Sequence, residues 1–483
     1  MADIDLRQQL DYLFNPGSVA LIGASNNLAK WGFHVLSLLI AKGGRTIFPV
    51  NKTDDEVQGL KAYPSVSQVP GPVDLAVITV PFRDVPAAIR DCASKGVKVA
   101  VVIPGGFAET GNEGEVIQRE VVKIARQGGI RIVGPNGMGH FNTATDFFTV
   151  PYLPPVKKGP LALIAQSGNT SQSVVYLASE LGLGFSKYVS SGNEADLHFE
   201  DYMEYLSEDD ETKIILGYIE GLKEGRRFFE LAREITRKKP VVIMKAGRTV
   251  AGARAAWSHT AALAGSDVVS EAAFRQSGVI RVEEVSELID VAVVLLGQPL
   301  PRGRKVGVLS AGGGAAVIAA DALMKQHLEL PQLSPDTIGK LNSLLPPRWS
   351  HVNPVETGGD PFSYSCLWAL MEDENVDAAL VIGGGGVTGS YAKWVSLPSS
   401  VSGQIDQWLD DAEVSELNDV DKSVELMKKY QKPIIFANIG VPTPRKGKIY
   451  EKLQNNYIVP FLTPERAAKA LALLVQYSEY LRA

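Results

Sequence analysis

Short apolar runs recur along the chain, and each one leads through a turn of small residues into a helical pattern. The most regular of these openings are Val19–Ser25, Leu161–Gly168 and Val306–Gly314. A buried strand that passes through such a turn into an amphipathic helix is the usual beginning of a parallel α/β domain. The pattern therefore predicts three parallel α/β domains in tandem.

Two linkers rich in proline and basic residues separate these openings. The first covers residues 151–160 and the second covers residues 298–304. Proline and glycine clusters of this kind interrupt both strand and helix patterns. We therefore expect Rossmann-like or flavodoxin-like domains with parallel sheets over residues 1–150, 151–298 and 299–483.

Within the first domain, apolar segments alternate with helical patterns and predict a parallel sheet with right-handed crossovers. Its expected strands are Val19–Ile22, Thr46–Val50, Leu75–Val80, Val99–Ile103 and Arg131–Val133. The second domain should contain helices at 172–181, 199–206 and 268–277. The third should contain strands at Lys305–Leu309, Ala378–Ile382 and Pro433–Asn438, whereas the acidic segment 390–419 is expected to be irregular.

Composition excludes several classes of protein. A chain of 483 residues is too long for one hydrophobic core, and a net charge of −6 gives no reason to expect nucleic acid binding. Cys92 and Cys366 are the two cysteines and lie far apart, so neither a disulfide framework nor a cysteine metal site is expected. The charged N-terminus does not resemble a signal peptide, and no apolar run reaches the ~18 residues of a membrane span. We therefore expect a cytoplasmic protein that carries no metal site and does not bind membranes.

Small residues surround His259, one of only six histidines in the chain. No second ligand stands at metal-ligand spacing, and the small neighbours leave the imidazole unshielded and let the backbone approach a phosphate. Ser266 and Asp267 can cap the helix that follows. From these residues alone, a solvated loop histidine and a functional histidine are equally supported.

Two other features of the second domain suit anion chemistry. Ser167-Gly168-Asn169 follows a strand and opens a helix, where free N–H groups and the positive helix end attract anions. The surrounding Ala-Gln-Ser-Gly-Asn pattern lacks the glycines of a hydrolase nucleophile elbow, so we exclude that alternative. Glu220 ends a strand at the edge where α/β sites form, although a surface glutamate that opens a short helix is the simpler interpretation.

The first domain lacks the Gly-x-Gly-x-x-Gly turn of dinucleotide-binding proteins. No acidic residue ends the second strand, where Asn51-Lys52 stands instead. Lysine and asparagine suit a phosphorylated ribose better than a free 2′-hydroxyl, which favours NADP or coenzyme A over NAD. In the third domain, the glycine-rich turns 311–314 and 383–386 could cradle phosphate, but tight turns are the preferred interpretation because no Lys-Ser/Thr pair follows either of them.

The segment around His259 resembles the phosphohistidine loop of the ADP-forming acyl-CoA synthetases, a branch of the succinyl-CoA synthetase superfamily. From about Asn15 onward, the order of the whole chain is similar to the α subunit of those enzymes, although Ala261 stands where relatives usually have glycine. The resemblance implies that His259 carries a phosphoryl group and that Glu220 orients its ring. The implied phosphate-binding residues are Ser167, Gly168 and Asn169.

The resemblance further implies that the first domain binds coenzyme A. The matching positions are Gly23, Ala24, Ser25, Asn51, Lys52, Val80, Pro81, Gly105, Gly106, Phe107, Pro135 and Asn136. The family often has cysteine after this asparagine, whereas this chain has Gly137, so no thiol chemistry is expected there. Ordinary tight turns at strand ends are the alternative interpretation of this glycine-rich set.

The sequence shows no ATP-grasp module and no Walker A pattern. The resemblance therefore implies a separate ATP-grasp β subunit that carries ADP or ATP and Mg²⁺, in a hetero-oligomer such as α2β2. This chain would be the α subunit of an acetate–CoA ligase type of enzyme. The enzyme would interconvert acyl-CoA, phosphate and ADP with a carboxylic acid, CoA and ATP, through an acyl phosphate and a phosphohistidine. The alternatives are a non-catalytic CoA-binding regulatory protein of the same fold and an NADP-dependent oxidoreductase.

Overall fold

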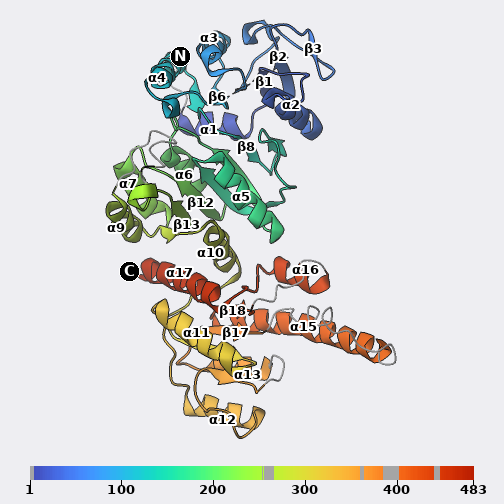
Figure 1. Ribbon diagram of the computed structural model, residues 1–483, viewed down its shortest axis with the longest axis vertical. Coiled ribbons are helices and arrows are strands. Elements are labelled where there is room, and N and C mark those ends of the chain that lie inside the picture. The colour runs from blue at the N-terminus through green and yellow to red at the C-terminus, as the bar shows by residue number, and fades with distance from the viewer. Residues whose placement is uncertain (1–4, 253, 255–265, 359–363, 384–401, 440–446) are drawn as a thin grey trace. The chain divides into compact units, whose positions relative to one another are not determined.

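The chain divides into two compact units, Met1–Leu288 and Ile289–Ala483 (Figure 1). The structure is a computed structural model, and it describes residues 5–252, 254, 266–358, 364–383, 402–439 and 447–483. His259 lies outside these residues, as do Ala261 and most of the turn 383–386. The predicted position of the histidine is therefore not tested by the fold.

The first unit begins with a five-stranded parallel sheet in the order β2-β1-β5-β6-β7. Its strands are β1 (Ser18–Ile22), β2 (Thr46–Val50), β5 (Leu75–Ile78), β6 (Val99–Val102) and β7 (Arg131–Val133). The predicted strands are confirmed, with small differences at their ends. The short antiparallel pair β3 (Glu56–Val57) and β4 (Leu60–Lys61) lies outside this sheet.

Helices cover both faces of this sheet. On one face, Ala20 and Ile22 join the core that contains α3 (Val85–Lys95) and α4 (Asn112–Gln127). On the other face, neighbouring strand residues join the core that contains α1 (Leu6–Phe14) and α2 (Trp31–Lys42). Because each face is buried, the strands are apolar at successive positions, which is the pattern of a parallel sheet.

A seven-stranded sheet follows in the order β14-β13-β12-β10-β11-β8-β9. Its strands are β8 (Gly139–Asn142), β9 (Phe147–Phe148), β10 (Lys158–Ala165), β11 (Phe185–Ser190), β12 (Ile214–Ile219), β13 (Val241–Lys245) and β14 (Ile280–Val282). All are parallel except β8, which runs antiparallel to β11, and β9, which runs antiparallel to β8. The apolar pattern does not predict β8 or β9, because this hairpin has no small-residue turn leading into a helix.

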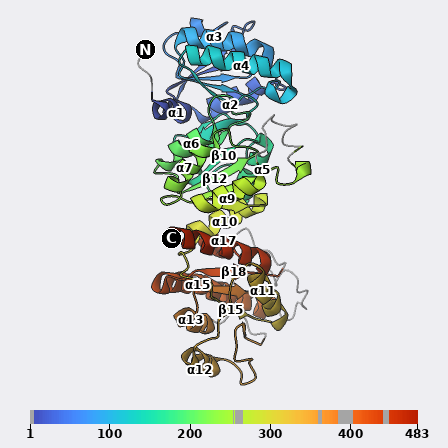
Figure 2. The same ribbon diagram turned by 90° about the vertical axis from the view of Figure 1, so that its left-hand side faces the viewer.

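Figure 2 shows α6 and α7 on one side of β10 and β12, and α5 on the other side. The helices of this region are α5 (Gly168–Glu180), α6 (Phe199–Ser207), α7 (Gly225–Ile235) and α9 (Asp267–Ser277). Phe228 of α7 packs between Phe199 of α6 and Phe274 of α9, with ring centroids 6.1 Å and 5.7 Å away. The predicted helices are thus confirmed, although α5 begins four residues earlier than the apolar pattern indicates.

The predicted cap of α9 is wrong in its details. Ser266 occupies the cap position, but its side chain makes no capping hydrogen bond. The Asp267 carboxylate instead accepts a hydrogen bond of 2.6 Å from Arg281, which follows on β14. The Asp267 carboxylate, which the sequence pattern predicts to cap α9, therefore pairs with Arg281 instead.

The second unit contains a parallel sheet in the order β16-β15-β17-β18. Its strands are β15 (Val306–Ser310), β16 (Val355–Glu356), β17 (Ala378–Ile382) and β18 (Ile434–Ala437), and α10 (Val285–Gly297) crosses the boundary between the units. One core contains α11 (Gly313–Lys325) and α17 (Pro464–Arg482). The other contains α12 (Pro335–Leu344), α13 (Tyr364–Glu372), α15 (Ser402–Tyr430) and α16 (Lys448–Asn455). The predicted strands are confirmed, and β16 is an addition.

The prediction of irregular structure over residues 390–419 is wrong from residue 402 onward, where the chain enters α15. Residues 390–401 lie outside the described part of the chain. In α15 the buried apolar side chains include Val420, Leu426 and Met427, which all lie near its C-terminal end. The first half of α15 carries apolar residues at the spacing of a helix, Ile405, Trp408, Leu409 and Ala412, and the prediction missed this helix because it followed the acidic composition instead.

Candidate functional site

The predicted phosphate site lies at the carboxyl edge of the second sheet. Ala165 of β10 pairs with Ser190 of β11 and with Tyr218 of β12, so these neighbouring strands end at the same level. Gln166 and Glu220 come directly after β10 and β12. Ligand sites of open parallel sheets form at this edge, because the carboxyl ends of the strands meet there.

Gln166 ties the ends of β10 and β12 together. Its Oε1 accepts hydrogen bonds from the backbone N–H groups of Glu220 (2.6 Å) and Gly221 (3.2 Å). Its Nε2 donates to the carbonyl oxygen of Gly221 (2.7 Å) and to Oε2 of Glu194 (3.0 Å). Two backbone donors on one side and two acceptors on the other allow only one orientation of the amide.

Glu194 completes this buried network from the loop that follows β11. Glu194 is only 2% exposed, and its Oε1 shares a hydrogen bond of 2.7 Å with the hydroxyl of Ser191. The pKa of Glu194 is raised to about 8, mainly by burial and also by the nearby Glu200 carboxylate, against the opposing effects of Ser191, Gln166 and Lys223. The neutral carboxyl group is therefore the favoured form at pH 7.

Glu220 is itself buried, with 4% of its surface exposed. The hydroxyl of Tyr218 lies near Glu220 and Thr170; burial is the main reason that its pKa is raised, Glu220 raises it further and Thr170 lowers it. Thr170 lies in the first turn of α5 and shares a hydrogen bond of 3.1 Å with the hydroxyl of Ser167. A chain of polar contacts thus joins Glu220 to the N-terminus of α5.

The N-terminus of α5 has the form of an anion cradle. Ser167 is the N-cap, and its side chain accepts a hydrogen bond from the N–H of Thr170. Asn169 is exposed. At Gly168 a Cβ atom would lie 2.2 Å from Cγ of Met138, so packing requires glycine at this position. The structure therefore places the predicted phosphate-binding residues beside Glu220, at a helix end that favours negative charge.

The predicted CoA-binding turns lie at the carboxyl edge of the first sheet, where the chain order reverses between β1 and β5. Gly23 has φ = +93°, and a Cβ on it would lie 2.7 Å from Oγ1 of Thr79 and 3.1 Å from Val80. A Cβ on Gly32, in the first turn of α2, would lie 2.0 Å from the carbonyl oxygen of Gly23. Only glycine gives this close approach of helix, turn and strand.

Asn51 holds the turns after β1 and β2 together. Its Nδ2 donates a hydrogen bond of 2.9 Å to the carbonyl oxygen of Ala24, and its Oδ1 accepts from the N–H of Thr53 at 2.8 Å. Ser25 is buried, and its hydroxyl accepts from the N–H of Asn27 at 3.0 Å. Lys52 is exposed beside them. The structure thus gives Asn51 a scaffold role and leaves Lys52 accessible at the end of β2.

The turn after β6 is closed by a carboxylate. Glu109 Oε1 accepts hydrogen bonds from the N–H groups of Gly106 (2.5 Å) and Phe107 (3.1 Å). A Cβ on Gly106, which has φ = +108°, would lie 2.8 Å from the ring of Phe82. Phe82 follows Pro81 after β5, so the turns after β5 and β6 pack directly on each other.

The loop after β11 connects this edge with the phosphate site. Asn193 Nδ2 donates to Oε2 of Glu109 (2.6 Å), and its Oδ1 accepts from Asn136 (3.3 Å). Its N–H donates to the carbonyl oxygen of Pro135 (2.9 Å). Its neighbour is Glu194, the partner of Gln166. One short loop therefore contacts a predicted CoA-binding turn and the predicted phosphate site.

Sequence reasoning missed both Gln166 and Glu194. A glutamine before the Ser-Gly turn and a glutamate in a loop of small residues were visible in the sequence. Nothing in the sequence pairs them, however, because their contact depends on β10 and β11 lying side by side. Their roles follow from the fold alone.

The described ends of the segment that carries His259 are anchored together. Lys245 ends β13 with 2% of its surface exposed, and its ammonium lies 3.9 Å from the Asp267 carboxylate at the start of α9. Arg281 also pairs with this carboxylate at 2.6 Å. Because Lys245 pairs with Ile219 in the sheet register, the segment leaves the edge next to Glu220.

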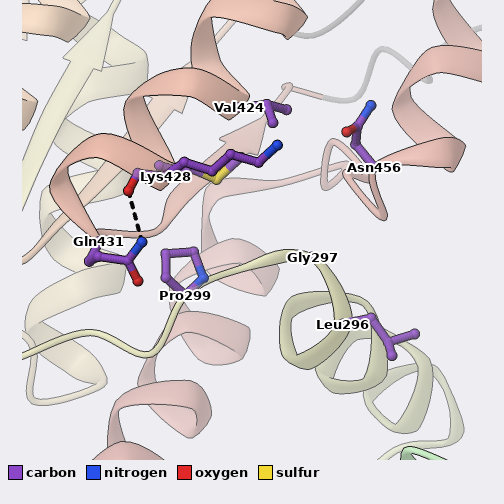
Figure 3. A pocket seen from close by; sticks show the side chains of 8 residues that line it. Leu296, Gly297, Pro299, Val424, Lys428, Gln431 and Asn456 are labelled. Atoms are coloured by element: carbon purple, nitrogen blue, oxygen red, sulfur yellow. Dashed lines mark hydrogen bonds between the residues drawn. The ribbon is translucent and has the colours of Figure 1, made fainter.

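A separate pocket of about 280 Å³ lies in the second unit, between the end of α10 and the helices α15 and α16 (Figure 3). It is lined by Leu296, Gly297, Pro299, Val424, Met427, Lys428, Gln431 and Asn456. The amide of Gln431 is bound to the carbonyl oxygen of Lys428 at 2.8 Å, as the dashed line shows. No predicted site residue lines this pocket.

Within the described ranges, no cluster of three or more histidine, cysteine, aspartate or glutamate side chains has the arrangement of a metal site.

No helix in the described parts of the chain is long and apolar enough to cross a membrane.

Comparisons with known proteins agree with this geometry. Residues 17–142 match the model of a CoA binding domain, and residues 158–295 match that of a succinyl-CoA ligase like flavodoxin domain. The α subunit of acetate–CoA ligase [ADP-forming] II from Pyrococcus furiosus is 45% identical over 377 residues, which cover 77% of this chain and 82% of the relative. The α subunit of ligase I from the same organism is 37% identical, and the alignment covers 98% of this chain and 98% of the relative.

A solved structure extends the match to the whole fold. The dinucleotide forming acetyl-coenzyme A synthetase 1 of Ca. Korarchaeum cryptofilum, in complex with phosphate and ADP, aligns with a TM-score of 0.81 and 32% identity. The alignment covers 98% of this chain and 97% of that chain. Fold and site define a CoA-binding protein of the succinyl-CoA ligase type. More particularly, the chain belongs to the family of ADP-forming acetate–CoA ligase α subunits.

Proposed function

We propose that this chain interconverts acyl-CoA and phosphate with a carboxylic acid and CoA, and passes the phosphoryl group through His259 to ADP. The observation that carries the proposal is the buried Glu220, joined through Tyr218 and Thr170 to the N-terminus of α5. A carboxylate and a helix N-terminus at one sheet edge can orient an imidazole and hold a phosphoryl group. The names of the relatives favour this catalytic role over a non-catalytic CoA-binding role.

The reaction would proceed in three balanced steps. Phosphate displaces the thiol of CoA from the acyl group and gives an acyl phosphate. A ring nitrogen of His259 then attacks the phosphorus, and the carboxylate leaves as the free acid. The phosphoryl group finally passes from this nitrogen to ADP. Glu220 would accept a hydrogen bond from the other ring nitrogen, which fixes the tautomer and keeps the attacking nitrogen unprotonated.

Coenzyme A would bind at the edge of the first sheet. The turns at Gly23 and Gly106 bring bare backbone to this edge, since a Cβ on either residue would clash with neighbouring atoms. Lys52 supplies an exposed cation just after β2, and its ammonium forms no ion pair with the described residues. These residues fit a ligand that carries phosphates on a ribose, because backbone approach and a free ammonium are what such groups require. When bound, coenzyme A supplies the thiol that leaves from and returns to the acyl group.

The nucleotide step would need a partner. Relatives that match this chain over most of their length are named α subunits, and their names describe ADP-forming ligases. We therefore place ADP or ATP and Mg²⁺ on a separate ATP-grasp β subunit. In this proposal, residues 1–150 bind CoA, residues 151–298 carry the phosphohistidine chemistry and residues 299–483 form the third domain. The cytoplasmic location inferred from the sequence remains a prediction.

The test is ATP formation from acetyl-CoA, phosphate and ADP by the full chain with its ATP-grasp partner. His259→Asn keeps a polar side chain of similar size but lacks the nucleophilic nitrogen, so ATP formation should fall to background. CoA binding, measured by calorimetry, should persist because it depends on another sheet edge. Acid-labile, alkali-stable phosphate on the wild-type chain would identify the nitrogen–phosphorus bond. ATP formation at the wild-type rate by His259→Asn would refute the phosphohistidine mechanism.

A further inference from the structure

We propose that Glu194 is a positioning residue of the phosphoryl-transfer site, and that it acts through Gln166 on the backbone at Glu220. The proposal rests on the proposed role of Glu220. It adds that this carboxylate is held in place from outside its own strand, by the loop after β11.

Gln166 attaches the backbone at Glu220 to the end of β10. Its backbone N–H donates to Oε1 of Gln166 at 2.6 Å, and the next residue, Gly221, makes two further bonds with the same amide. These contacts lie immediately after the last residue of β12, where ladder hydrogen bonds end. Without the amide, the buried N–H of Glu220 would lose its partner, and a buried unpaired donor is costly.

Glu194 helps to fix the orientation of the Gln166 amide. Glu194 and the carbonyl of Gly221 both accept hydrogen bonds from Nε2, so they hold Oε1 toward the two backbone N–H groups. A flipped amide would point its oxygen at two acceptors and its NH₂ group at two donors. Glu194 thus supplies half of the constraint that fixes the amide, and Ser191 fixes Glu194 in turn at 2.7 Å.

The surroundings of Glu194 decide which side chains can replace it. The groups that face Glu194 are Gln166, Ser191, Glu200, Lys223 and Tyr202. The pKa of this glutamate is raised to about 8, mainly by burial, so the carboxyl is mostly protonated at neutral pH. With the proton on Oε1, toward the hydroxyl of Ser191, Oε2 still accepts from Gln166. Glutamine can replace a neutral carboxyl here, since its oxygen can face Gln166 while its NH₂ group donates to the hydroxyl of Ser191. Leucine fills a similar volume and offers no acceptor.

These substitutions give a direct test in the full chain with its ATP-grasp partner. Glu194→Leu should lower kcat for ATP formation from acetyl-CoA by about 10- to 100-fold, as expected when a reacting group is displaced slightly, with little change in the KM for acetyl-CoA. Glu194→Gln should retain kcat within about threefold, because it restores the acceptor for Gln166. Gln166→Met should reproduce the loss, which provides a second route if Glu194→Leu fails to fold.

Asp196 provides a matched control in the same loop. Its side chain is fully buried and bonds to Arg126 and Arg131, and none of its hydrogen bonds in the described structure goes to Gln166. Asp196→Asn should therefore destabilise the loop without lowering kcat as Glu194→Leu does. Equal losses of kcat in the two variants would show a merely structural role for the loop and would overturn the proposal.

The Glu220→Gln background separates this proposal from the proposed function. If Glu194 acts through Glu220, then adding Glu194→Leu to Glu220→Gln should lower kcat by no more than about twofold further. If the full effect of Glu194→Leu persists in that background, the positioning role is refuted while the role of Glu220 stands. If Glu220→Gln alone has the wild-type kcat, the proposed role of Glu220 fails, and the positioning role fails with it.

Discussion

The two carboxyl edges of the first unit share a strand–turn–helix pattern but differ in the kinds of residue that form them. The edge of β2-β1-β5-β6-β7 consists of glycine turns, where backbone atoms approach closely. Asn51 holds two of these turns together by a hydrogen bond to the backbone of Ala24. The edge formed by β10, β11 and β12 instead carries buried polar side chains, which are joined by hydrogen bonds from Glu194 through Gln166 to the backbone of Glu220. In the proposed function, the first of these edges binds a ligand and the second carries out phosphoryl transfer.

This difference predicts opposite tolerances to substitution. The first edge depends on glycines, which have no side chain, so an added methyl group should damage it more than a change of polarity. The second edge depends on which atom donates and which accepts. There, an isosteric change that keeps the hydrogen bonds should be mild, and one that removes an acceptor should be severe.

The largest effect in this comparison is expected at Glu220. Glu220→Gln keeps an oxygen that can accept from the imidazole but loses the negative charge, so kcat should fall by about 10- to 100-fold. The affinity for CoA should stay unchanged, because the variant lies at the second edge. Steady-state kinetics and calorimetry measure the two quantities. Glu230→Gln, an exposed change on α7, is the control, and a loss of CoA affinity in Glu220→Gln would contradict the separation of the edges.

A smaller effect is expected at Lys52. If its ammonium meets the 3′-phosphate of CoA, then Lys52→Ala should weaken CoA binding by about 5- to 10-fold, as expected for one exposed charge-assisted contact. Binding of 3′-dephospho-CoA should change little. The exposed Lys123 on α4 is a matched control, and Lys123→Ala should affect neither ligand. An equal loss for both ligands in Lys52→Ala would assign the lysine to another part of CoA.

The sequence predicted the first edge better than the second, for a physical reason. Gly23 and Lys52 stand directly after apolar runs, so local pattern and sheet topology place them at an edge. The contact of Gln166 with Glu194 joins residues 28 apart, and that of Asn193 with Glu109 joins residues 84 apart. Such contacts depend on which strands become neighbours. Helix α15 was missed for a different reason, because the prediction followed the acidic composition of its first half although Ile405, Trp408 and Leu409 stand there at helical spacing.

The central claim is that the first edge serves CoA and the second serves phosphoryl transfer. Gly23→Ala tests it most directly, because a Cβ there would lie 2.7 Å from Thr79 in a backbone with φ = +93°. Gly44→Ala is the matched control, since Gly44 has φ = +77° and no atom within 4 Å of its Cβ position. The measurement is phosphorylation of the full chain from acetyl-CoA and phosphate, compared with phosphorylation from acetyl phosphate, which bypasses CoA.

For Gly23→Ala we predict at least about a tenfold loss of phosphorylation from acetyl-CoA, as expected for a strained and displaced turn, and no loss from acetyl phosphate. Gly44→Ala should retain both rates. An equal loss from both donors in Gly23→Ala, with Gly44→Ala unaffected, would show that the two edges do not divide the reaction between them and would contradict the account.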